Sequence, residues 1–326
     1  MSALPDFQLL RPTTAADAVA LRAANAASRY IAGGTDLLPN IRRGLVEPGV
    51  VIDLGGIAEL THIEFAGDAL RIGAGATLAA IAGDAAIRKR LPALAEAAEA
   101  VAGPTHRAAA TLGGNLCLDT RCVYYNQSEF WRESNDYCMK LNGEGCRVAK
   151  KSKRCYAAFS GDVAPALIAL DAELEILGPS GSRRVAIADF YRDDGMAWLT
   201  LDADELLTGV HIPLRDGWSS AYEKVRVRGA IDFPLAGVAV ALKRKGNTIE
   251  DLRVACTGVS SRPLAVEGLA DLAGKPLDAA ALAVITAQTE IAASAMRTTV
   301  VDMLYRRGVA PVLARRMAER LWNATV

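Results

Sequence analysis

The residues with the clearest chemical potential are the cysteines, because five of the six lie between positions 117 and 155. In a reducing cytosol, thiols stay free, ligate metal or take part in catalysis. From Cys122 onward, the next three cysteines follow after gaps of fifteen, seven and eight residues. This spacing matches neither the paired cysteines of zinc ribbons nor the bacterial ferredoxin pattern. The clustering therefore indicates a metal site, while the spacing alone leaves the metal open.

Two Gly-Gly turns could hold a phosphate group. Gly33-Gly34-Thr35 follows a short apolar segment and opens a helical pattern, so its backbone N–H groups would converge near a helix N-terminus. A pyrophosphate fits such a turn without a basic side chain. The second turn, Gly113-Gly114, stands in Thr-Leu-Gly-Gly-Asn. Neither turn has the P-loop or the Rossmann fingerprint. A single Gly-Gly pair is usually just a tight turn, but two of them favour a dinucleotide.

Composition limits the class of protein. A chain of 326 residues predicts about two domains of roughly 150 residues each. It is 51% hydrophobic and 23% charged with a formal net charge of zero, which is typical of a globular protein and argues against a dedicated nucleic-acid binder. No apolar run reaches the roughly 18 residues of a membrane span, and the N-terminus does not resemble a secretory signal. We therefore expect a cytoplasmic protein without membrane contact.

The elements around the first glycine turn alternate between helix and strand. Hydrophobic periodicity predicts a small α/β layer over residues 1–58 and a second, larger unit over 59–217. In order, the expected elements are a helix over 15–27, a strand over 29–32, a helix over 37–43, strands over 50–54 and 69–75, a helix capped by Thr77, a helix over 92–101, a helix over 162–170 and a strand over 172–177.

A third unit is expected over residues 218–326. Three strands are predicted over 221–228, 236–243 and 249–258, and Gly246-Asn247 turns the second into the third. Helices are predicted over 263–272, 278–291 and 296–322. A three-stranded antiparallel sheet with a helical layer makes this an α+β domain.

The stretch from 119 to 160 interrupts the regular pattern and reads as an insertion. A structureless loop of this length is uncommon in a compact domain, so it should be functional or tied down. Cations on it could stabilise an anionic metal cluster, form a docking patch for an acidic electron donor, or simply be solvated. The basic residues are Lys140, Arg147, Lys150, Lys151, Lys153 and Arg154.

Four separated blocks resemble the FAD-binding medium subunit of the xanthine oxidase / carbon monoxide dehydrogenase family. They are residues 31–38, 110–116, 162–173 and 221–226, in the family's order. The resemblance implies a vanillyl-alcohol-oxidase-type (PCMH-like) FAD-binding fold in two α/β subdomains, followed by a carbon-monoxide-dehydrogenase-flavoprotein C-terminal domain. It also implies two partners, a large molybdopterin subunit and a small subunit with [2Fe–2S] clusters.

The same resemblance implies the residues that would bind FAD. A cation near the flavin would favour its anionic reduced form, and this role falls to Lys224, although a solvated strand lysine is the plain alternative. No catalytic residue is expected on this chain. The implied cofactor residues are Ala32, Gly33, Gly34, Thr35 and Asp36 at the pyrophosphate, Thr111, Gly114, Asn115 and Asp162 at the ribityl, phosphate or adenosine part, and Lys224 near the isoalloxazine.

The insertion departs from that family pattern and is similar to the β subunit of 4-hydroxybenzoyl-CoA reductase. That resemblance implies an extra [4Fe–4S] cluster held by the four cysteines inside the insertion. Cys117, within a family-like block, and Cys256, within an alternating strand, are expected to be buried core residues. The implied ligands are Cys122, Cys138, Cys146 and Cys155.

These features lead to one functional prediction and two alternatives. The chain is expected to relay electrons between ferredoxin, the [4Fe–4S] cluster, FAD and a partner [2Fe–2S] cluster, for reductive dehydroxylation of 4-hydroxybenzoyl-CoA to benzoyl-CoA. The first alternative is the FAD subunit of an oxidising molybdenum hydroxylase, of the aldehyde, CO or xanthine dehydrogenase type. The second is a zinc-stapled binding module without redox activity.

Overall fold

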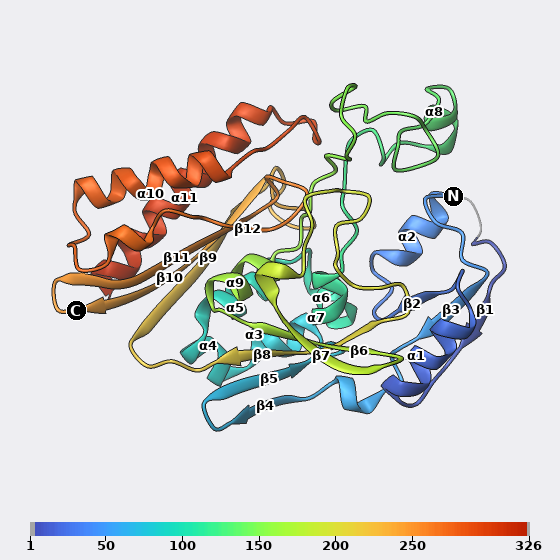
Figure 1. Cartoon of the computed structure of the whole chain (residues 1–326), viewed down its shortest axis with the longest axis horizontal. Coiled ribbons are helices and arrows are strands. Elements are labelled where there is room, and N and C mark those ends of the chain that lie inside the picture. Colours follow the sequence, from blue (N-terminus) through green and yellow to red (C-terminus); the bar gives the residue numbers. More distant parts are fainter. Residues whose placement is uncertain (1–3, 325–326) are drawn as a thin grey trace.

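Three β-sheets with flanking helices make up residues 4–324, the part of the chain that this computed structural model describes (Figure 1). The first sheet is parallel, in the order β1-β3-β2. Thr14 caps its helix α1 by accepting a hydrogen bond from the N–H of Asp17 at 3.1 Å. Its elements are β1 (Gln8–Leu10), α1 (Ala15–Ala24), β2 (Arg29–Ile31), α2 (Leu37–Arg42) and β3 (Val50–Asp53).

The second sheet has five antiparallel strands in the order β4-β5-β8-β6-β7. The largest apolar core of the described residues lies between this sheet and the helices over it. The strands are β4 (Ile63–Ala66), β5 (Ala69–Gly73), β6 (Glu173–Gly178), β7 (Gly181–Ala186) and β8 (Leu206–Pro213). The helices are α3 (Leu78–Gly83), α4 (Ala85–Arg90), α5 (Pro92–Ala100), α6 (Pro104–Ala109), α7 (Leu112–Leu116) and α9 (Val163–Ala169).

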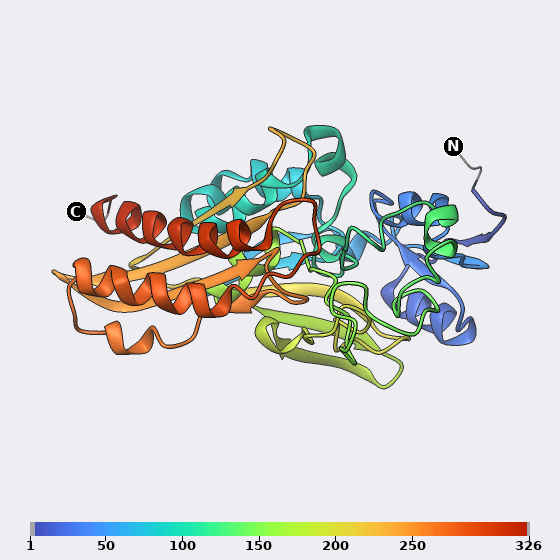
Figure 2. The same ribbon diagram turned by 90° about the horizontal axis from the view of Figure 1, so that it is seen from above.

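The third sheet is antiparallel, in the order β12-β11-β10-β9, and Figure 2 shows its two long helices lying along it. Alanines of α5 and α9 pack against Tyr222 and the alanines of β10, so small side chains let the second and third units approach closely. The elements are β9 (Trp218–Val225), β10 (Ala236–Lys245), β11 (Thr248–Thr257), β12 (Leu264–Ala265), α10 (Ala279–Ala292) and α11 (Met303–Ala324).

Three details of the third unit differ from the sequence prediction. The sheet has a fourth strand, because Leu264 and Ala265 pair with β11, so the helix expected over 263–272 is wrong and only a 3-10 turn remains at Ala270–Leu272. The last helix begins at Met303, not at 296. The chain before it curls around the buried guanidinium of Arg306, which donates to the carbonyl of Met296 at 2.8 Å. The carbonyl of Met296 therefore accepts a hydrogen bond from a side chain, and the helix begins only at Met303.

The insertion projects beside α2, away from the second and third sheets (Figure 1). It contains one short helix, α8 (Glu129–Glu133). Its two ends meet, because Arg121 and Ala158 exchange backbone hydrogen bonds of 2.8 and 2.7 Å. The Arg132 side chain, 2% exposed, ties the insertion to the end of α2 by donating to the carbonyl of Arg43 at 2.8 Å. The insertion is therefore held to itself where its two ends meet and to the rest of the fold at the end of α2.

A small apolar cluster adds to this anchoring. Leu45 packs with Cys122, Tyr125, Cys155 and Ala157, so two of the cysteines belong to a core of their own. Among residues 4–324, no helix is both long and apolar enough to cross a membrane.

Candidate functional site

The loop between β2 and α2 is built for close approach of a ligand to its backbone. The N–H groups of Gly33, Gly34, Thr35 and Asp36 donate to no other group among the described residues. A Cβ on Gly33 would lie 1.9 Å from the carbonyl oxygen of Ala109, and Gly34 has a φ of +69°. Only glycine fits the first position and is unstrained at the second. This loop presents free donors that a pyrophosphate could use.

The second glycine pair is not the turn that was expected, because Gly113 and Gly114 lie inside helix α7, but it lies next to the first loop, since Ala109 and Ala110 contact Gly33. Its own donors are already used. Gly113 N–H donates to the carbonyl of Ala74 at 2.7 Å, and Gly114 N–H donates to the hydroxyl of Thr111 at 3.1 Å. The start of α7 therefore supplies shape and proximity, while the free N–H groups belong to the first loop.

Asp162 and Lys224 are brought together as a buried ion pair. The Lys224 ammonium lies 3.0 Å from the Asp162 carboxylate, and the two side chains are 3% and 4% exposed. The hydroxyl of Tyr222 donates to the same carboxylate at 2.6 Å. Asn115 reaches this region too, because its side-chain oxygen accepts from the N–H of Val163 at 3.1 Å. Lys224 is thus not the solvated strand lysine of the alternative reading.

Burial acts on the two charges of this pair in opposite directions. It raises the pKa of Asp162, which Lys224 and the Tyr222 hydroxyl oppose. It lowers the pKa of Lys224, which Asp162 opposes. Because each charge offsets the desolvation of the other, removing either partner would leave an uncompensated buried charge.

The four insertion cysteines line a single cavity. Cys122, Cys146 and Cys155 are buried and Cys138 is half-buried, and all four face the same space together with Lys140 and Arg147. Within residues 4–324, no three side chains of Cys, His, Asp or Glu lie close enough to share one metal ion. The thiols therefore surround a space and do not converge on a point.

Burial disfavours ionisation of two thiols in this cavity, those of Cys122 and Cys155. Burial raises the pKa of Cys122 to about 11, against the N–H groups of Tyr124 and Tyr125, which lower it. Burial raises the pKa of Cys155 to about 12, against the N–H of Ala157, which donates to its sulfur at 3.4 Å. A bound cationic centre would be needed to hold them as thiolates.

The other two cysteines lie elsewhere. Cys117 packs against the main core at the end of α7, and burial raises its pKa to about 12. Cys256 is fully buried in β11 within the core of the third unit. Neither lines the cavity.

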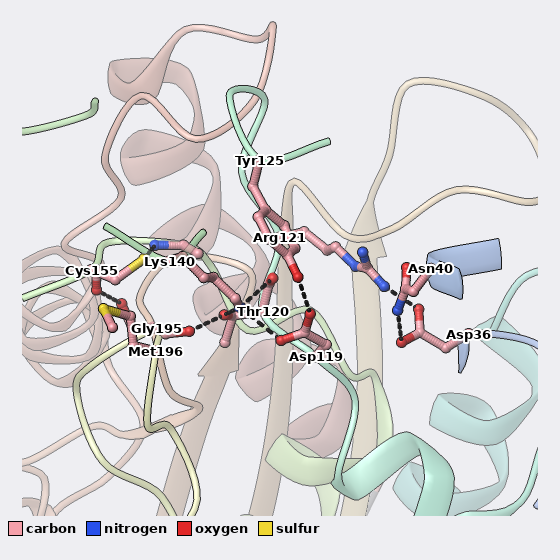
Figure 3. A network of polar contacts seen from close by, with 12 residues as sticks. Asp36, Asn40, Asp119, Thr120, Arg121, Tyr125, Lys140, Cys155, Gly195 and Met196 are labelled. Atoms are coloured by element: carbon pink, nitrogen blue, oxygen red, sulfur yellow. Dashed lines mark hydrogen bonds and ion pairs between the residues drawn. The ribbon is translucent and has the colours of Figure 1, made fainter. Parts of the chain in front are cut away.

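A polar network that sequence reasoning missed connects the cavity to the first glycine loop (Figure 3). Arg121 forms an ion pair with Asp36. Lys140 donates to Asp119 at 2.7 Å and to the carbonyl of Thr120 at 3.0 Å. The Lys140 side chain is only 6% exposed, so the prediction of solvated basic residues is wrong for this one. Sequence gave no signal for the roles of Arg121, Asp119 or Tyr222, since each depends on partners far along the chain.

Comparison with known proteins shows the family. Residues 5–215 match the FAD binding domain in molybdopterin dehydrogenase, and residues 220–321 match the CO dehydrogenase flavoprotein C-terminal domain. The chain therefore belongs to the FAD-binding medium subunits of the xanthine oxidase / carbon monoxide dehydrogenase family of molybdenum enzymes. The predicted fold, a PCMH-like FAD-binding domain followed by this C-terminal domain, is confirmed.

Individual relatives agree over nearly the whole chain. The aldehyde oxidoreductase FAD-binding subunit PaoB of Escherichia coli (strain K12) is 31% identical, with 96% of this chain and 99% of that protein covered. The carbon monoxide dehydrogenase medium chain of Afipia carboxidovorans is 30% identical, with 96% of each covered. A crystal structure of the Cu,Mo-CO dehydrogenase in its cyanide-inactivated form superposes with a TM-score of 0.82 at 28% identity, with 100% of each chain covered.

Proposed function

We propose that this chain is the electron-transfer subunit of an oxidising molybdenum hydroxylase and carries a [4Fe–4S] cluster in addition to FAD. The observation that carries the cluster is the convergence of Cys122, Cys138, Cys146 and Cys155 on one cavity, while Cys117 and Cys256 lie apart from it. The observation that supports the FAD site is the glycine loop after β2, whose free N–H groups lie beside the start of α7.

The FAD site of this proposal is divided between two regions. Residues 32–36 would hold the pyrophosphate through the free N–H groups of residues 33–36, beside the start of α7, where Thr111, Gly114 and Asn115 lie. The buried pair of Asp162 and Lys224 would lie toward the flavin, where a fixed charge tunes its electronics. When bound, FAD supplies both one-electron and two-electron chemistry.

The cysteine cavity fits a four-iron cluster better than a single zinc ion. Zinc needs its sulfur ligands about 2.3 Å from one point. In this chain no three candidate ligands approach that closely among the described residues, whereas four thiols enclose one space. A cubane is larger than one ion and takes four thiolates, one for each iron. The N–H of Ala157 donates a hydrogen bond to the sulfur of Cys155, and such hydrogen bonds stabilise thiolate ligands of a cluster.

The relatives favour oxidation over reduction of the substrate. Those that match over most of this chain are described as subunits or medium chains of aldehyde oxidoreductase, xanthine dehydrogenase and carbon monoxide dehydrogenase. We therefore place the oxidising reading first. Reductive dehydroxylation of 4-hydroxybenzoyl-CoA is a second candidate, favoured only by the cysteine insertion. An assay of the holoenzyme for benzoyl-CoA formation against aldehyde oxidation separates the two.

The partners belong to the proposal as well. We propose a large molybdopterin subunit, where the substrate reacts, and a small [2Fe–2S] subunit. Ferredoxin is the proposed external carrier, because Lys150, Lys151 and Lys153 are exposed on the insertion beside the cavity and would attract an acidic protein. We also propose a cytoplasmic location, because the thiols that hold a cluster must stay reduced.

The test is the cofactor content of the full chain, produced together with its partners and separated from them under anaerobic conditions before flavin, iron and sulfide are measured. The expected result is FAD together with about four iron and four sulfide per chain. Zinc without sulfide would support the zinc-stapled alternative, and FAD without any metal would remove the cluster from the proposal.

Cysteine variants then locate the cluster. Single Cys→Ser changes at 122, 138, 146 and 155 should each lower the iron content and leave FAD bound. Cys117→Ser and Cys256→Ser are the matched controls and should keep the iron. Loss of iron in Cys117→Ser with retention in Cys122→Ser would mean that the ligand set is shifted by one cysteine.

A further inference from the structure

Lys140 is an unusual cation because it is almost wholly removed from water beside the cysteine cavity. Its side chain is 6% exposed, and it lines the cavity with the four cysteines. The ammonium lies 4.8 Å from the ring centre of Tyr125 and 4.9 Å from that of Trp198, so two aromatic faces enclose it. A desolvated charge acts on its neighbours far more strongly than an exposed one.

The charge of Lys140 is oriented as well as buried. Its ammonium donates to Asp119 at 2.7 Å and to Thr120, and Figure 3 shows these partners clustered around it. Lys140 lines the cavity, whereas Asp119 does not. The hydrogen bonds of the ammonium go to Asp119 and Thr120, neither of which lines the cavity, so the charge of Lys140 lies in the wall behind the space that the thiols enclose. Thr120 in turn donates to the carbonyl of Gly195 at 2.6 Å, which fixes the whole arrangement.

We propose that Lys140 sets the reduction potential of the cluster that the cysteine cavity holds, with Asp119 as its counter-charge. This inference rests on the proposed cluster. Reduction adds an electron to an object that four thiolates already make anionic, so a fixed, desolvated cation beside it stabilises the reduced form and raises the potential. Asp119 partly offsets that effect. Lys140 is a positioning residue for electron transfer and is not a cluster ligand.

The other cations of the insertion affect the reduction potential of the proposed cluster less than Lys140 does. Arg147 also lines the cavity, with its Nε donating to the carbonyl of Tyr137 at 2.9 Å, and is only partly buried. Lys150, Lys151 and Lys153 are exposed, where water and salt screen their charge. The four-carbon stem of Lys140 matches the length of methionine, so the charge can be removed with little change in packing.

The test is an EPR-monitored redox titration of the cluster in the full chain with its partners. Lys140→Met should lower the midpoint potential by at least about 59 mV, which is a tenfold change in the ratio of reduced to oxidised cluster for one electron. Lys140→Arg should stay near the wild type. Asp119→Asn should move the potential in the opposite direction, upward, because it leaves the ammonium uncompensated. Lys151→Met is the control for loss of one exposed charge.

The outcomes separate this inference from the proposed function. Absence of iron and sulfide from the wild-type chain after its separation from the partners would contradict the cluster itself. A normal cluster whose potential moves no further in Lys140→Met than in Lys151→Met would overturn the role of Lys140. If Lys140→Met does not assemble the cluster, the sign of the Asp119→Asn shift decides, and a downward shift or none would overturn the inference.

Discussion

The guanidinium of Arg121 is paired with the carboxylate of Asp36, which joins the base of the insertion to the glycine loop after β2. Arg121 directly precedes Cys122, and Asp36 directly precedes α2. Burial raises the pKa of Asp36, and Arg121 is the main influence that opposes this rise. The loop proposed for the pyrophosphate and the segment proposed for the cluster therefore share one ion pair.

Removing the cation of this pair should destabilise the chain and weaken FAD binding. Arg121→Met leaves Asp36 partly buried without its partner, at an expected cost of about 1–3 kcal/mol in the free energy of unfolding. Urea unfolding and flavin content measure the two effects. If Arg121→Met keeps both at the wild-type level, the pair does not support the loop.

The same variant should gain a pH dependence with a defined sign. The pKa of Asp36 in the folded state lies above its ordinary value of 3.8, and without Arg121 it rises further. A raised folded-state pKa means that stability is complete below the ordinary value and is lost as the pH rises through the raised one. The Tm of Arg121→Met should therefore fall with rising pH more than that of Arg121→Met/Asp36→Asn, in which the carboxylate is absent.

Gly34→Val should yield folded protein with little flavin. The φ of +69° is strained for a β-branched residue by about 1–2 kcal/mol, and relief of that strain displaces the loop. Because about 1.4 kcal/mol corresponds to tenfold in affinity, we expect roughly a tenfold weaker FAD affinity. Gly49→Ala is the matched control, since a Cβ there meets nothing within 4 Å. Wild-type flavin occupancy in Gly34→Val would show that the loop does not hold the pyrophosphate.

Asp162 and Lys224 should behave as one unit. Each single change, Asp162→Asn or Lys224→Met, should cost about 3–5 kcal/mol in unfolding free energy, because the remaining charge stays buried. The double variant should cost clearly less than the sum of the two. Glu99→Gln, which removes an exposed ion pair with Arg88, is the control and should cost at most about 1 kcal/mol. Additive single effects would mean that the pair is not coupled.

Electron transfer with ferredoxin should depend on the exposed lysines of the insertion. Changing Lys150, Lys151 and Lys153 to Glu should slow association with ferredoxin at low ionic strength by about tenfold or more, and added salt should shrink the difference. The control changes the exposed Lys89, Lys245 and Lys275 to Glu, which alters the net charge equally at scattered positions. Equal slowing in both triple variants would place the docking site elsewhere.

Local patterns predicted the elements whose causes are local. Thr77 does cap α3, with its hydroxyl 3.1 Å from the N–H of Ala80, and the turn at Gly246 does join β10 to β11. The first glycine turn could be identified because only glycine tolerates its geometry, whereas Gly113-Gly114, expected as a turn, lies inside helix α7. The hydrogen bonds of the second pair could not be predicted, because the N–H of Gly113 donates to the carbonyl of Ala74, which lies far from it in the sequence.

The buried cations were the main features that could not be predicted from the sequence. Arg132, Arg306 and Lys140 carry charges that composition assigns to the surface, yet all three are buried. Their burial depends on carbonyl and carboxylate groups that remote segments present, such as the carbonyl of Arg43 for Arg132. The start of α11 was missed for the same reason, since Arg306 competes for the carbonyl of Met296.

The meeting of the two ends of the insertion at Arg121 and Ala158 has an evolutionary consequence. A segment that leaves and re-enters a fold at one point can be acquired or deleted in a single genetic event, and the framework on either side keeps its geometry. The thiol cavity and the flavin fold can thus be inherited independently. A member of this family could gain or lose the cysteine-bearing segment while the rest of the chain keeps its fold.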